Sequence, residues 1–162
     1  MKPVSPRVIE LLNAGLTLEL TVINTYFLNA RMLDNWGLQR LGQVFYDLSI
    51  AEMKDADEFI QRILMFDGHP NVQKLGAIQV GEDPEEVLRL AYDGEQEAIA
   101  LFNAGAEECH ALGDHATALY FETGARDEER HADWLEGQLD AIARVGAQNY
   151  LAQHLDPSSG PA

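Results

Sequence analysis

Two short segments of the sequence share a pattern that suits metal binding. The segment DEERHAD places Glu128 three residues before His131, and the segment AEMKDAD places Glu52 three residues before Asp55. Residues three apart lie on one face of an α-helix, so each pair can present two ligands to one ion. Carboxylate oxygens with one imidazole suit a hard to borderline metal such as iron or manganese. The two segments differ in the second ligand, which is histidine in one and aspartate in the other.

Two more glutamates, Glu19 and Glu95, occupy equivalent positions on other helical segments. Each of the four glutamates has mainly apolar residues three, four and seven positions away, so each lies within the apolar face of its segment. A spacing of 33 residues separates Glu19 from Glu52, and the same spacing separates Glu95 from Glu128. The chain therefore reads as two helical hairpins of matching design, in which paired glutamates meet at the same height.

Four glutamates on inward faces predict bound cations. A single glutamate on an apolar face usually lies at the edge of a bundle with its carboxylate in water. Four at matched positions cannot all be buried, charged and unpaired, because desolvation costs several kcal/mol for each. Either they are protonated or they share cations. One known solution holds two metals between four helices with glutamates and Glu-x-x-His pairs. The candidate ligands are Glu19, Glu52, Asp55, Glu95, Glu128 and His131.

Helical periodicity predicts the elements that position these residues. Apolar residues at steps of three and four predict long helices over about 6–36, 38–66, 84–112 and 115–145, and a short helix within 147–155. Ser5-Pro6 and Asp83-Pro84 are typical of helix starts, and Gly146 is typical of a helix end. Residues 67–83 show no helical period and contain three glycines and a proline, which indicates a long connection.

The lengths of the connections predict the topology. A short loop makes antiparallel neighbours, whereas a connection of about 17 residues can run the length of a bundle and return the third helix parallel to the second. The sequence therefore predicts an all-α, ferritin-like four-helix bundle with a long crossover between the second and third helices and a short fifth C-terminal helix. We expect one domain over residues 1–155 and a disordered tail over 156–162.

Composition restricts the partners and the compartment. The 162 residues include 27 acidic and 11 basic side chains, and the formal net charge of −16 argues against nucleic acid as a partner. No apolar run approaches the roughly 20 residues of a membrane span, and the N-terminus lacks the apolar core of a signal peptide. The single cysteine, Cys109, fits a reducing compartment. We expect a cytoplasmic protein without nucleic-acid or membrane partners.

The sequence resembles the bacterioferritins, the haem-containing bacterial ferritins, over nearly the whole chain. The resemblance is carried by VIELLNAGLTLELTVINTYFLNARMLDNWG, SIAEMKDAD, RILMFDGHPN, RDEERHADWLEGQLDAI and GAQNYLAQ. Rubrerythrins share the di-iron bundle but add a module with paired cysteines, which this sequence does not have. The DNA-protecting starvation ferritins place their iron site between subunits and do not have the four-glutamate pattern.

The resemblance implies an iron-storage protein with ferroxidase activity. Members of the family form a hollow shell of 24 subunits, oxidise Fe(II) with O2 or H2O2 at a di-iron centre within each subunit, and store the Fe(III) mineral inside. They carry haem b, one per two subunits. The resemblance also implies that a ferredoxin donates electrons for iron release.

The resemblance also assigns the ligands. Glu52 and Glu128 would bridge both irons. Glu95 and His131 would complete one iron. Glu19 and the residue at position 55 would complete the other. Met53 matches the axial haem ligand, and at about 100° per residue it points well away from Glu52.

Tyr26 follows Glu19 on the apolar face of the first helix, and two roles are open for it. It can hydrogen-bond a ligand or supply an electron, or it can be a buried tyrosine that needs a partner.

Two positions depart from the family pattern. Ala51 stands where some members have an aspartate that, with a residue matching Asp47, holds an extra iron on the inner surface, so that inner site is in question. Asp55 stands where the family has histidine. One interpretation is an asymmetric di-metal centre with weaker or altered occupancy beside Glu19 and Asp55.

The alternative for Asp55 is that it turns away from the centre. The chain would then be a haem-binding shell subunit with impaired ferroxidase activity that co-assembles with an active bacterioferritin subunit. A third interpretation is a small di-metal oxidase or peroxidase with no shell.

Overall fold

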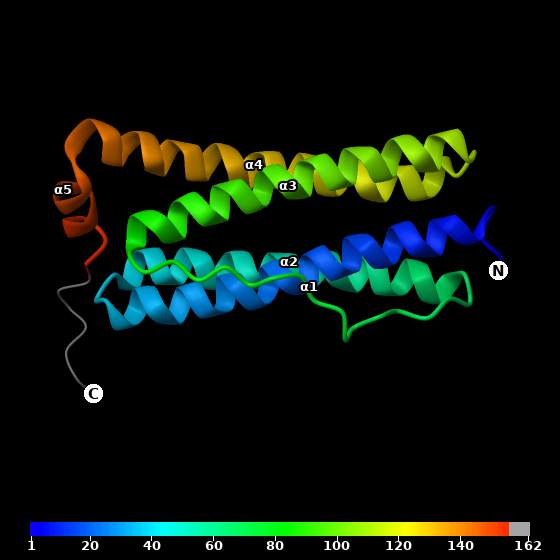
Figure 1. The fold of residues 1–162 in the computed structure, drawn as a ribbon, viewed down its shortest axis with the longest axis horizontal. Helices are drawn as coiled ribbons and strands as arrows, with labels where there is room; N and C mark the ends of the chain where they lie inside the picture. Colours follow the sequence, from blue (N-terminus) through cyan, green and yellow to red (C-terminus); the bar gives the residue numbers. More distant parts are fainter. Residues whose placement is uncertain (156–162) are drawn as a thin grey trace.

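Five α-helices make up most of the chain in the computed structural model, which describes residues 1–155 (Figure 1). The helices are α1 (Pro6–Asn35), α2 (Gln39–Met65), α3 (Pro84–Ala111), α4 (His115–Val145) and α5 (Ala147–Ala152). The predicted all-α class and all five helices are confirmed, and the ends of the four long helices agree with the sequence prediction to within one residue. The tail predicted over 156–162 lies outside the described residues.

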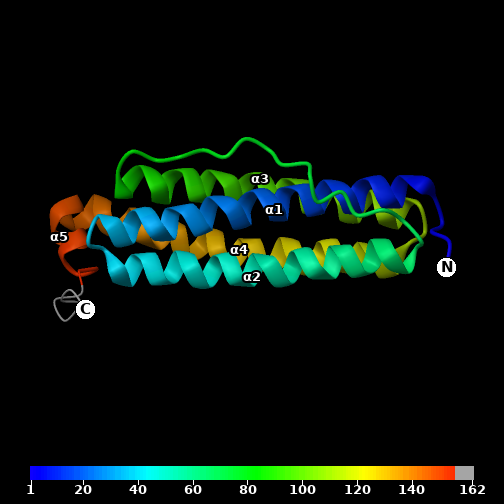
Figure 2. The same cartoon turned by 90° about the horizontal axis from the view of Figure 1, so that it is seen from below.

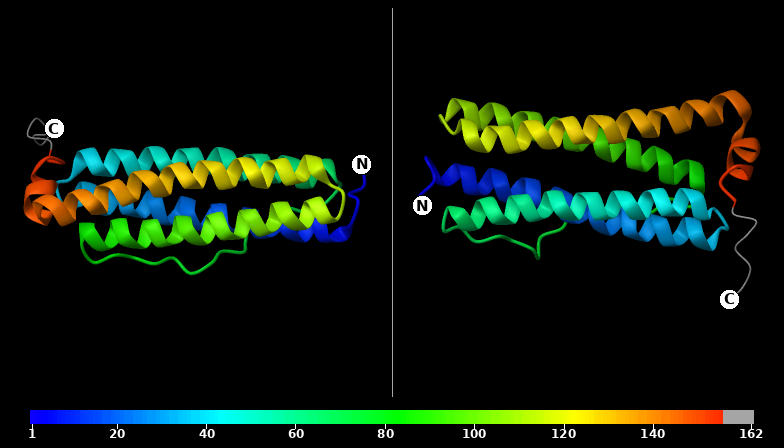
Figure 3. Two further views of the ribbon diagram at one scale, coloured as in Figure 1. Left: turned by 90° about the horizontal axis from the view of Figure 1, so that it is seen from above. Right: turned by 180° about the vertical axis from the view of Figure 1, so that it is seen from behind.

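The four long helices form two antiparallel hairpins that pack against each other. Figure 2 shows α1 and α2 running in opposite directions, and Figure 3 shows the same pairing for α3 and α4. α2 and α3 run in the same direction, because the connection between them travels along the outside of the bundle before α3 begins. This long crossover is the one predicted from the connection lengths.

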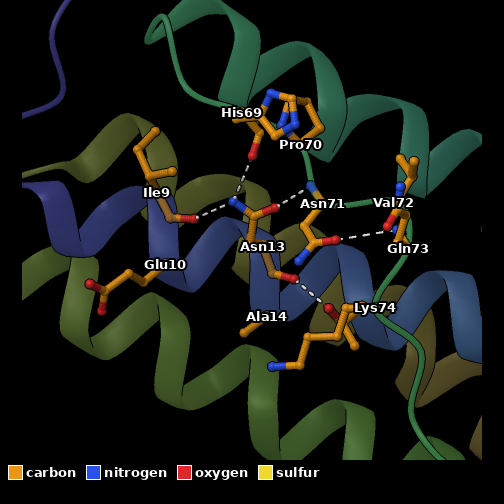
Figure 4. A pocket seen from close by; sticks show the side chains of 11 residues that line it. Ile9, Glu10, Asn13, Ala14, His69, Pro70, Asn71, Val72, Gln73 and Lys74 are labelled. Atoms are coloured by element: carbon orange, nitrogen blue, oxygen red, sulfur yellow. Dashed lines mark hydrogen bonds between the residues drawn. The ribbon is translucent and has the colours of Figure 1, made fainter.

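The connection is fixed to α1 by side chains of that helix (Figure 4). The Asn13 amide donates to the carbonyl of His69 at 3.2 Å, and its oxygen accepts from the backbone N–H of Asn71 at 2.7 Å. Further along, the N–H of Gly76 donates to Thr21 Oγ1 at 2.8 Å. A cavity of about 620 Å³ lies between this part of the connection and α1, and none of the four mid-helix glutamates lines it.

The helix ends form where the sequence predicts them. The Ser5 side chain accepts from the N–H of Arg7, and Asp83 accepts from the N–H of Glu86 at 2.9 Å, so each satisfies a free donor in a first turn. Gly146 has a φ of 82°, a left-handed conformation that a side chain disfavours. It ends α4 and turns the chain into α5.

Two apolar clusters fill the bundle and leave a polar layer between them. The first cluster contains Phe59, Phe102 and Phe121, whose ring centroids lie 5.4–6.0 Å apart. The second contains Tyr26 and Phe45. Along each long helix, the residues of one cluster end before the mid-helix glutamate and those of the other begin after it. The four glutamates therefore form a layer across the middle of the core.

A buried charged network joins the two hairpins at one end of the bundle. Arg62, near the end of α2, donates to Thr117 Oγ1 of α4 at 2.9 Å and lies 3.5 Å from Asp114. The Arg62 and Asp114 side chains are 11% and 7% exposed. Asp114 also accepts from the backbone N–H of Thr117 at 3.0 Å, which caps the start of α4. Charged groups this deeply buried depend on their partners.

Among the described residues, α1 is the one helix that is long and apolar enough to cross a membrane. An 18-residue window of this helix reaches a mean hydropathy of 1.2. In the fold, however, α1 turns its apolar face into the bundle and places Glu19 there at 0% exposure. Core helices of this kind meet the same criterion, so the absence of a membrane partner stays a prediction.

Candidate metal centre

Each long helix contributes one buried glutamate to the polar layer. Glu19 comes from α1, Glu52 from α2, Glu95 from α3 and Glu128 from α4, and none is more than 2% exposed. The local cause is the helical period, because each glutamate follows apolar residues of one cluster and precedes those of the other. The amphipathic faces that bury the core therefore also carry these carboxylates inward.

Three of these glutamates converge with His131. One ligand atom from each of Glu52, Glu95, Glu128 and His131 lies within 4.8 Å of the others. His131 Nδ1 is 3.0 Å from Glu52 Oε1, 3.2 Å from Glu128 Oε2 and 3.8 Å from Glu95 Oε1. The Glu-x-x-His pair of α4 thus faces carboxylates from α2 and α3. Three oxygens and one imidazole nitrogen can surround a single cation.

Burial and mutual repulsion raise the pKa values of the carboxyl groups. Burial is the main cause of the raised pKa of Glu19, and the charges of Glu52 and Glu128 add to it. For Glu95, burial together with Glu128 raises the pKa to about 10. Burial lowers the pKa of His131, but Glu128 and Glu52 outweigh that effect and the pKa rises to about 10. Without metal, the centre therefore retains protons at neutral pH.

Several oxygens of the layer lack hydrogen-bond partners. Within residues 1–155, both carboxylate oxygens of Glu19 and Oε2 of Glu95 are buried without a partner. The approach of His131 to Glu52 is an ion-pair contact outside hydrogen-bonding geometry. Buried acceptors in folded proteins almost always have a partner. A cation would satisfy these oxygens, so the donor set fits a hard or borderline divalent metal.

Tyr26 contacts the centre through Glu95. Its hydroxyl donates a hydrogen bond to Glu95 Oε1 across the bundle, and the side chain is 2% exposed. Burial and the charge of Glu95 raise the pKa of Tyr26 well above its usual range, so the phenol remains a donor. A cavity of about 440 Å³ between α1, α3 and the connection is lined in part by Tyr26. This bond is compatible with both roles left open for Tyr26, because it contacts a candidate ligand and also satisfies a buried tyrosine that needs a partner.

Glu19 and Asp55 lie outside the four-residue group. Asp55 is partly exposed and makes no hydrogen bond or ion pair with any residue in the range 1–155. Burial, followed by the charges of Glu52 and Glu128, raises the pKa of Asp55 to about 6. The side of the layer with a histidine is therefore compact, and the side with the aspartate is more open.

Met53 lies on the outer face of the first hairpin. Its side chain is 51% exposed, and the nearby face of α1 exposes Phe27 to 49%. The Phe27 and Tyr46 rings lie 6.4 Å apart, and the Arg31 guanidinium lies 5.1 Å from the centroid of Tyr46. An exposed thioether on the same hairpin as these aromatic rings fits a haem held between subunits. The chain alone does not complete such a site.

Asn29 is a buried polar residue that the sequence pattern did not single out. It is 2% exposed, and its amide oxygen has no hydrogen-bond partner among the described residues. Asn29 follows Tyr26 by three residues on α1, so both lie on the inward face. The sequence signal for Asn29 is a polar side chain on the inward face of the helix. This signal was missed because Ala30, the next residue, already satisfied the apolar period.

Comparisons with known proteins agree with this fold. Residues 9–145 match the family model described as a ferritin-like domain. The chain is 41% identical over 145 residues to the bacterioferritin of Brucella melitensis, covering 90% of each chain. It is 39% identical over 151 residues to the bacterioferritin of Rhodobacter capsulatus, covering 93% of this chain and 94% of the relative. It is 40% identical over 160 residues to that of Streptomyces coelicolor, covering 96% of each. The chain therefore belongs to the bacterioferritin family of ferritin-like proteins.

Proposed function

We propose that this protein stores iron and detoxifies it by oxidising Fe(II) at a di-iron centre inside each subunit. The observation that carries the proposal is the buried convergence of Glu52, Glu95, Glu128 and His131 within 4.8 Å. Their oxygens include buried acceptors without hydrogen-bond partners. Membership of the bacterioferritin family supports iron as the metal and storage as the purpose.

The proposal gives each ligand a role. Glu52 and Glu128 bridge the two ions. Glu95 and His131 complete the ion on the compact side. Glu19 and Asp55 complete the ion on the open side. Two Fe(II) ions would each give up one electron and become Fe(III), and these electrons with two protons would reduce O2 to H2O2 or H2O2 to two water molecules.

The surrounding residues prepare the ligands for this chemistry. Tyr26 holds Glu95 by its hydrogen bond, which limits the rotamers available to that carboxylate. The two apolar clusters on either side exclude water from the layer, and this strengthens the attraction between the carboxylates and a cation. Metal binding displaces the protons that the metal-free centre retains, because the ligands bind as carboxylates and neutral imidazole.

Anaerobic Fe(II) titration followed by exposure to O2 tests the proposal. We expect two equivalents of Fe(II) bound per subunit and rapid oxidation. Glu128→Gln should slow the oxidation at least tenfold because it removes a bridging carboxylate. Glu129→Gln is the matched control, since Glu129 is the exposed neighbour on the same helix. Oxidation by Glu128→Gln at the wild-type rate would refute the assignment.

A second candidate function follows from the position of Asp55. Because Asp55 lies outside the four-residue group, the alternative is a shell subunit with impaired oxidation that co-assembles with an active bacterioferritin subunit. In that case the titration gives about one equivalent per subunit with slow oxidation. Asp55→His would then restore the second equivalent, whereas it would change little if the wild-type chain already binds two.

The shell and the haem are part of the same proposal. We expect an assembly of 24 subunits with haem b bound by Met53 from each of two subunits. Size exclusion tests the first expectation, because a particle near the chain mass of 18.0 kDa would contradict storage in a shell. A Soret band of about one haem per two subunits tests the second. Met53→Leu should abolish that band, and Met65→Leu, on the same helix and 39% exposed, should not.

The remaining partners follow from the proposed cycle. Iron release requires a reductant, and a ferredoxin is the expected donor of electrons. We expect the protein to act in the cytoplasm. Reduction of the stored Fe(III) by a ferredoxin, measured as Fe(II) captured by a chromogenic chelator, tests the donor directly.

A further inference from the structure

A second group of potential metal ligands lies at the end of the second hairpin. His110 is in the last turn of α3, and His115 is the first residue of α4. The turn between them reverses the chain through Gly113, whose φ of 79° is left-handed. As a result His110 Nδ1 lies 2.9 Å from His115 Nδ1, and the two ring centroids are 5.2 Å apart.

A carboxylate of α4 fixes one of the two rings. Glu122 Oε1 lies 2.6 Å from His110 Nε2, so this nitrogen carries the proton and donates to the carboxylate. The Nδ1 atom of His110 therefore presents its lone pair toward His115. A carboxylate that holds the far nitrogen of a histidine in this way is the usual partner of a metal-ligating imidazole.

The separation of the two Nδ1 atoms fits a shared ion. Two nitrogens at ~2.0–2.1 Å from one metal, with an angle between about 90° and 109°, are about 2.8–3.4 Å apart. The observed 2.9 Å is at the lower end of that range. Without metal, one N–H···N hydrogen bond explains the contact. An ion replaces that single proton, and His115 then carries its proton on Nε2.

The group is accessible and separate from the glutamate layer. The His110 and Glu122 side chains are 44% and 49% exposed. Glu128 follows His115 by 13 residues on α4, which corresponds to about 20 Å along the helix axis. The α3–α4 turn lies at the end of the bundle near the N-terminus (Figure 1). This cluster is therefore not a part of the di-metal centre.

We propose that His110 and His115 form a surface site for a divalent transition metal of the zinc, copper and nickel class, bound through both Nδ1 atoms and oriented by Glu122. Imidazole nitrogen is a preferred ligand of this class. The acidic charge of the chain raises the local concentration of cations around the exposed rings. The remaining coordination positions face solvent.

Zinc titration of the assembled protein by calorimetry tests the site. We expect one class of Zn²⁺ sites to disappear in both His110→Ala and His115→Ala, and to weaken by about 10–100-fold in Glu122→Gln. His69→Ala is the matched control, because His69 is an exposed histidine on the α2–α3 connection. Glu128→Gln should leave this class unchanged, which separates it from binding at the di-metal centre.

Electron paramagnetic resonance with Cu²⁺ supplies the second measurement. The spectrum of the wild-type site should show coupling to two imidazole nitrogens, and each histidine variant should lose that signature. An unchanged Zn²⁺ stoichiometry in both histidine variants would overturn the proposal. So would a site that requires only one of the two histidines. Circular dichroism and size exclusion of the variants verify that losses do not come from unfolding.

Discussion

Removing the charge of Glu19 should stabilise the metal-free protein. Glu19 is 0% exposed, and neither of its carboxylate oxygens has a hydrogen-bond partner in the part of the chain that the structure describes, so burial raises its pKa and favours the protonated form in the folded state. In the unfolded chain it ionises above its ordinary pKa of 4.5. Glu19→Gln imitates the protonated carboxyl in shape and removes the ionisation from the unfolded state. The variant therefore lacks the part of the pH-dependent loss of stability that comes from Glu19, while Glu95 still contributes its own.

The size of the effect follows from this difference in proton binding. Because the folded pKa is raised, the folded chain retains a proton that the unfolded chain releases above pH 4.5, and stability declines as pH rises through that window. Each pH unit between the unfolded and the folded pKa changes the free energy of unfolding by about 1.4 kcal/mol, so the gain from Glu19→Gln grows as pH rises above 4.5. For a chain of this length, each ~1.4 kcal/mol corresponds to a rise of ~3–6 °C in Tm. The difference should fall towards zero near pH 4.5.

Thermal unfolding of the metal-free protein at several pH values measures this difference. Glu129→Gln, an exposed change on α4, is the control and should shift Tm by little at any pH. A redox-inert divalent ion such as Zn²⁺ should reverse the order, because it stabilises the wild-type centre more than the variant. A lower Tm for metal-free Glu19→Gln, or a gain that does not depend on pH, would refute the reasoning.

Three further substitutions test other parts of the fold. Tyr26→Phe removes the hydrogen-bond donor to Glu95 and should destabilise the protein by about 1–3 kcal/mol in chemical denaturation. A denaturation midpoint of the variant equal to that of the wild type would contradict the buried hydrogen bond. Arg62→Ala leaves Asp114 buried without its cation and should cost about 3–5 kcal/mol, whereas Arg144→Ala, at an exposed i,i+4 pair, should cost less than about 1 kcal/mol. Gly146→Ala, at a φ of 82°, should lower Tm by a few degrees, corresponding to ~1 kcal/mol.

The helices and their ends could be predicted because their causes are local in sequence. The apolar period of α1 continues through Leu12, Leu16 and Ala30, and the same residues are buried in the structure. Ser5 and Asp83 cap helices with their own side chains, which needs no tertiary contact. The topology followed from the connection lengths, since only the long connection can return a helix in the parallel direction.

The centre could be predicted only in part, because its geometry depends on contacts between helices. Equal spacing placed Glu19 at the height of Glu52 and Glu95 at the height of Glu128, and all four are buried. Spacing within a helix cannot reveal that Tyr26 reaches across to Glu95, which depends on how α1 and α3 pack. It also cannot reveal whether the carboxylate of Asp55 joins the group, because side-chain rotation decides that.

The asymmetry of the centre is one of charge as well as of ligand type. On the compact side, the His131 imidazolium lies within 4 Å of three carboxyl groups and offsets part of their negative charge when no metal is bound. Glu19 makes no such contact, and Asp55 adds a carboxyl with a pKa of about 6 that is mostly ionised at neutral pH. A bound cation therefore stabilises the open side more than the compact side. However, Asp55 is a shorter and more exposed ligand than His131. At Asp55, the stronger attraction for a cation favours metal binding, and the looser geometry of the ligand disfavours it. The metal occupancy of the open side therefore decides between an active ferroxidase and a shell subunit with impaired oxidation.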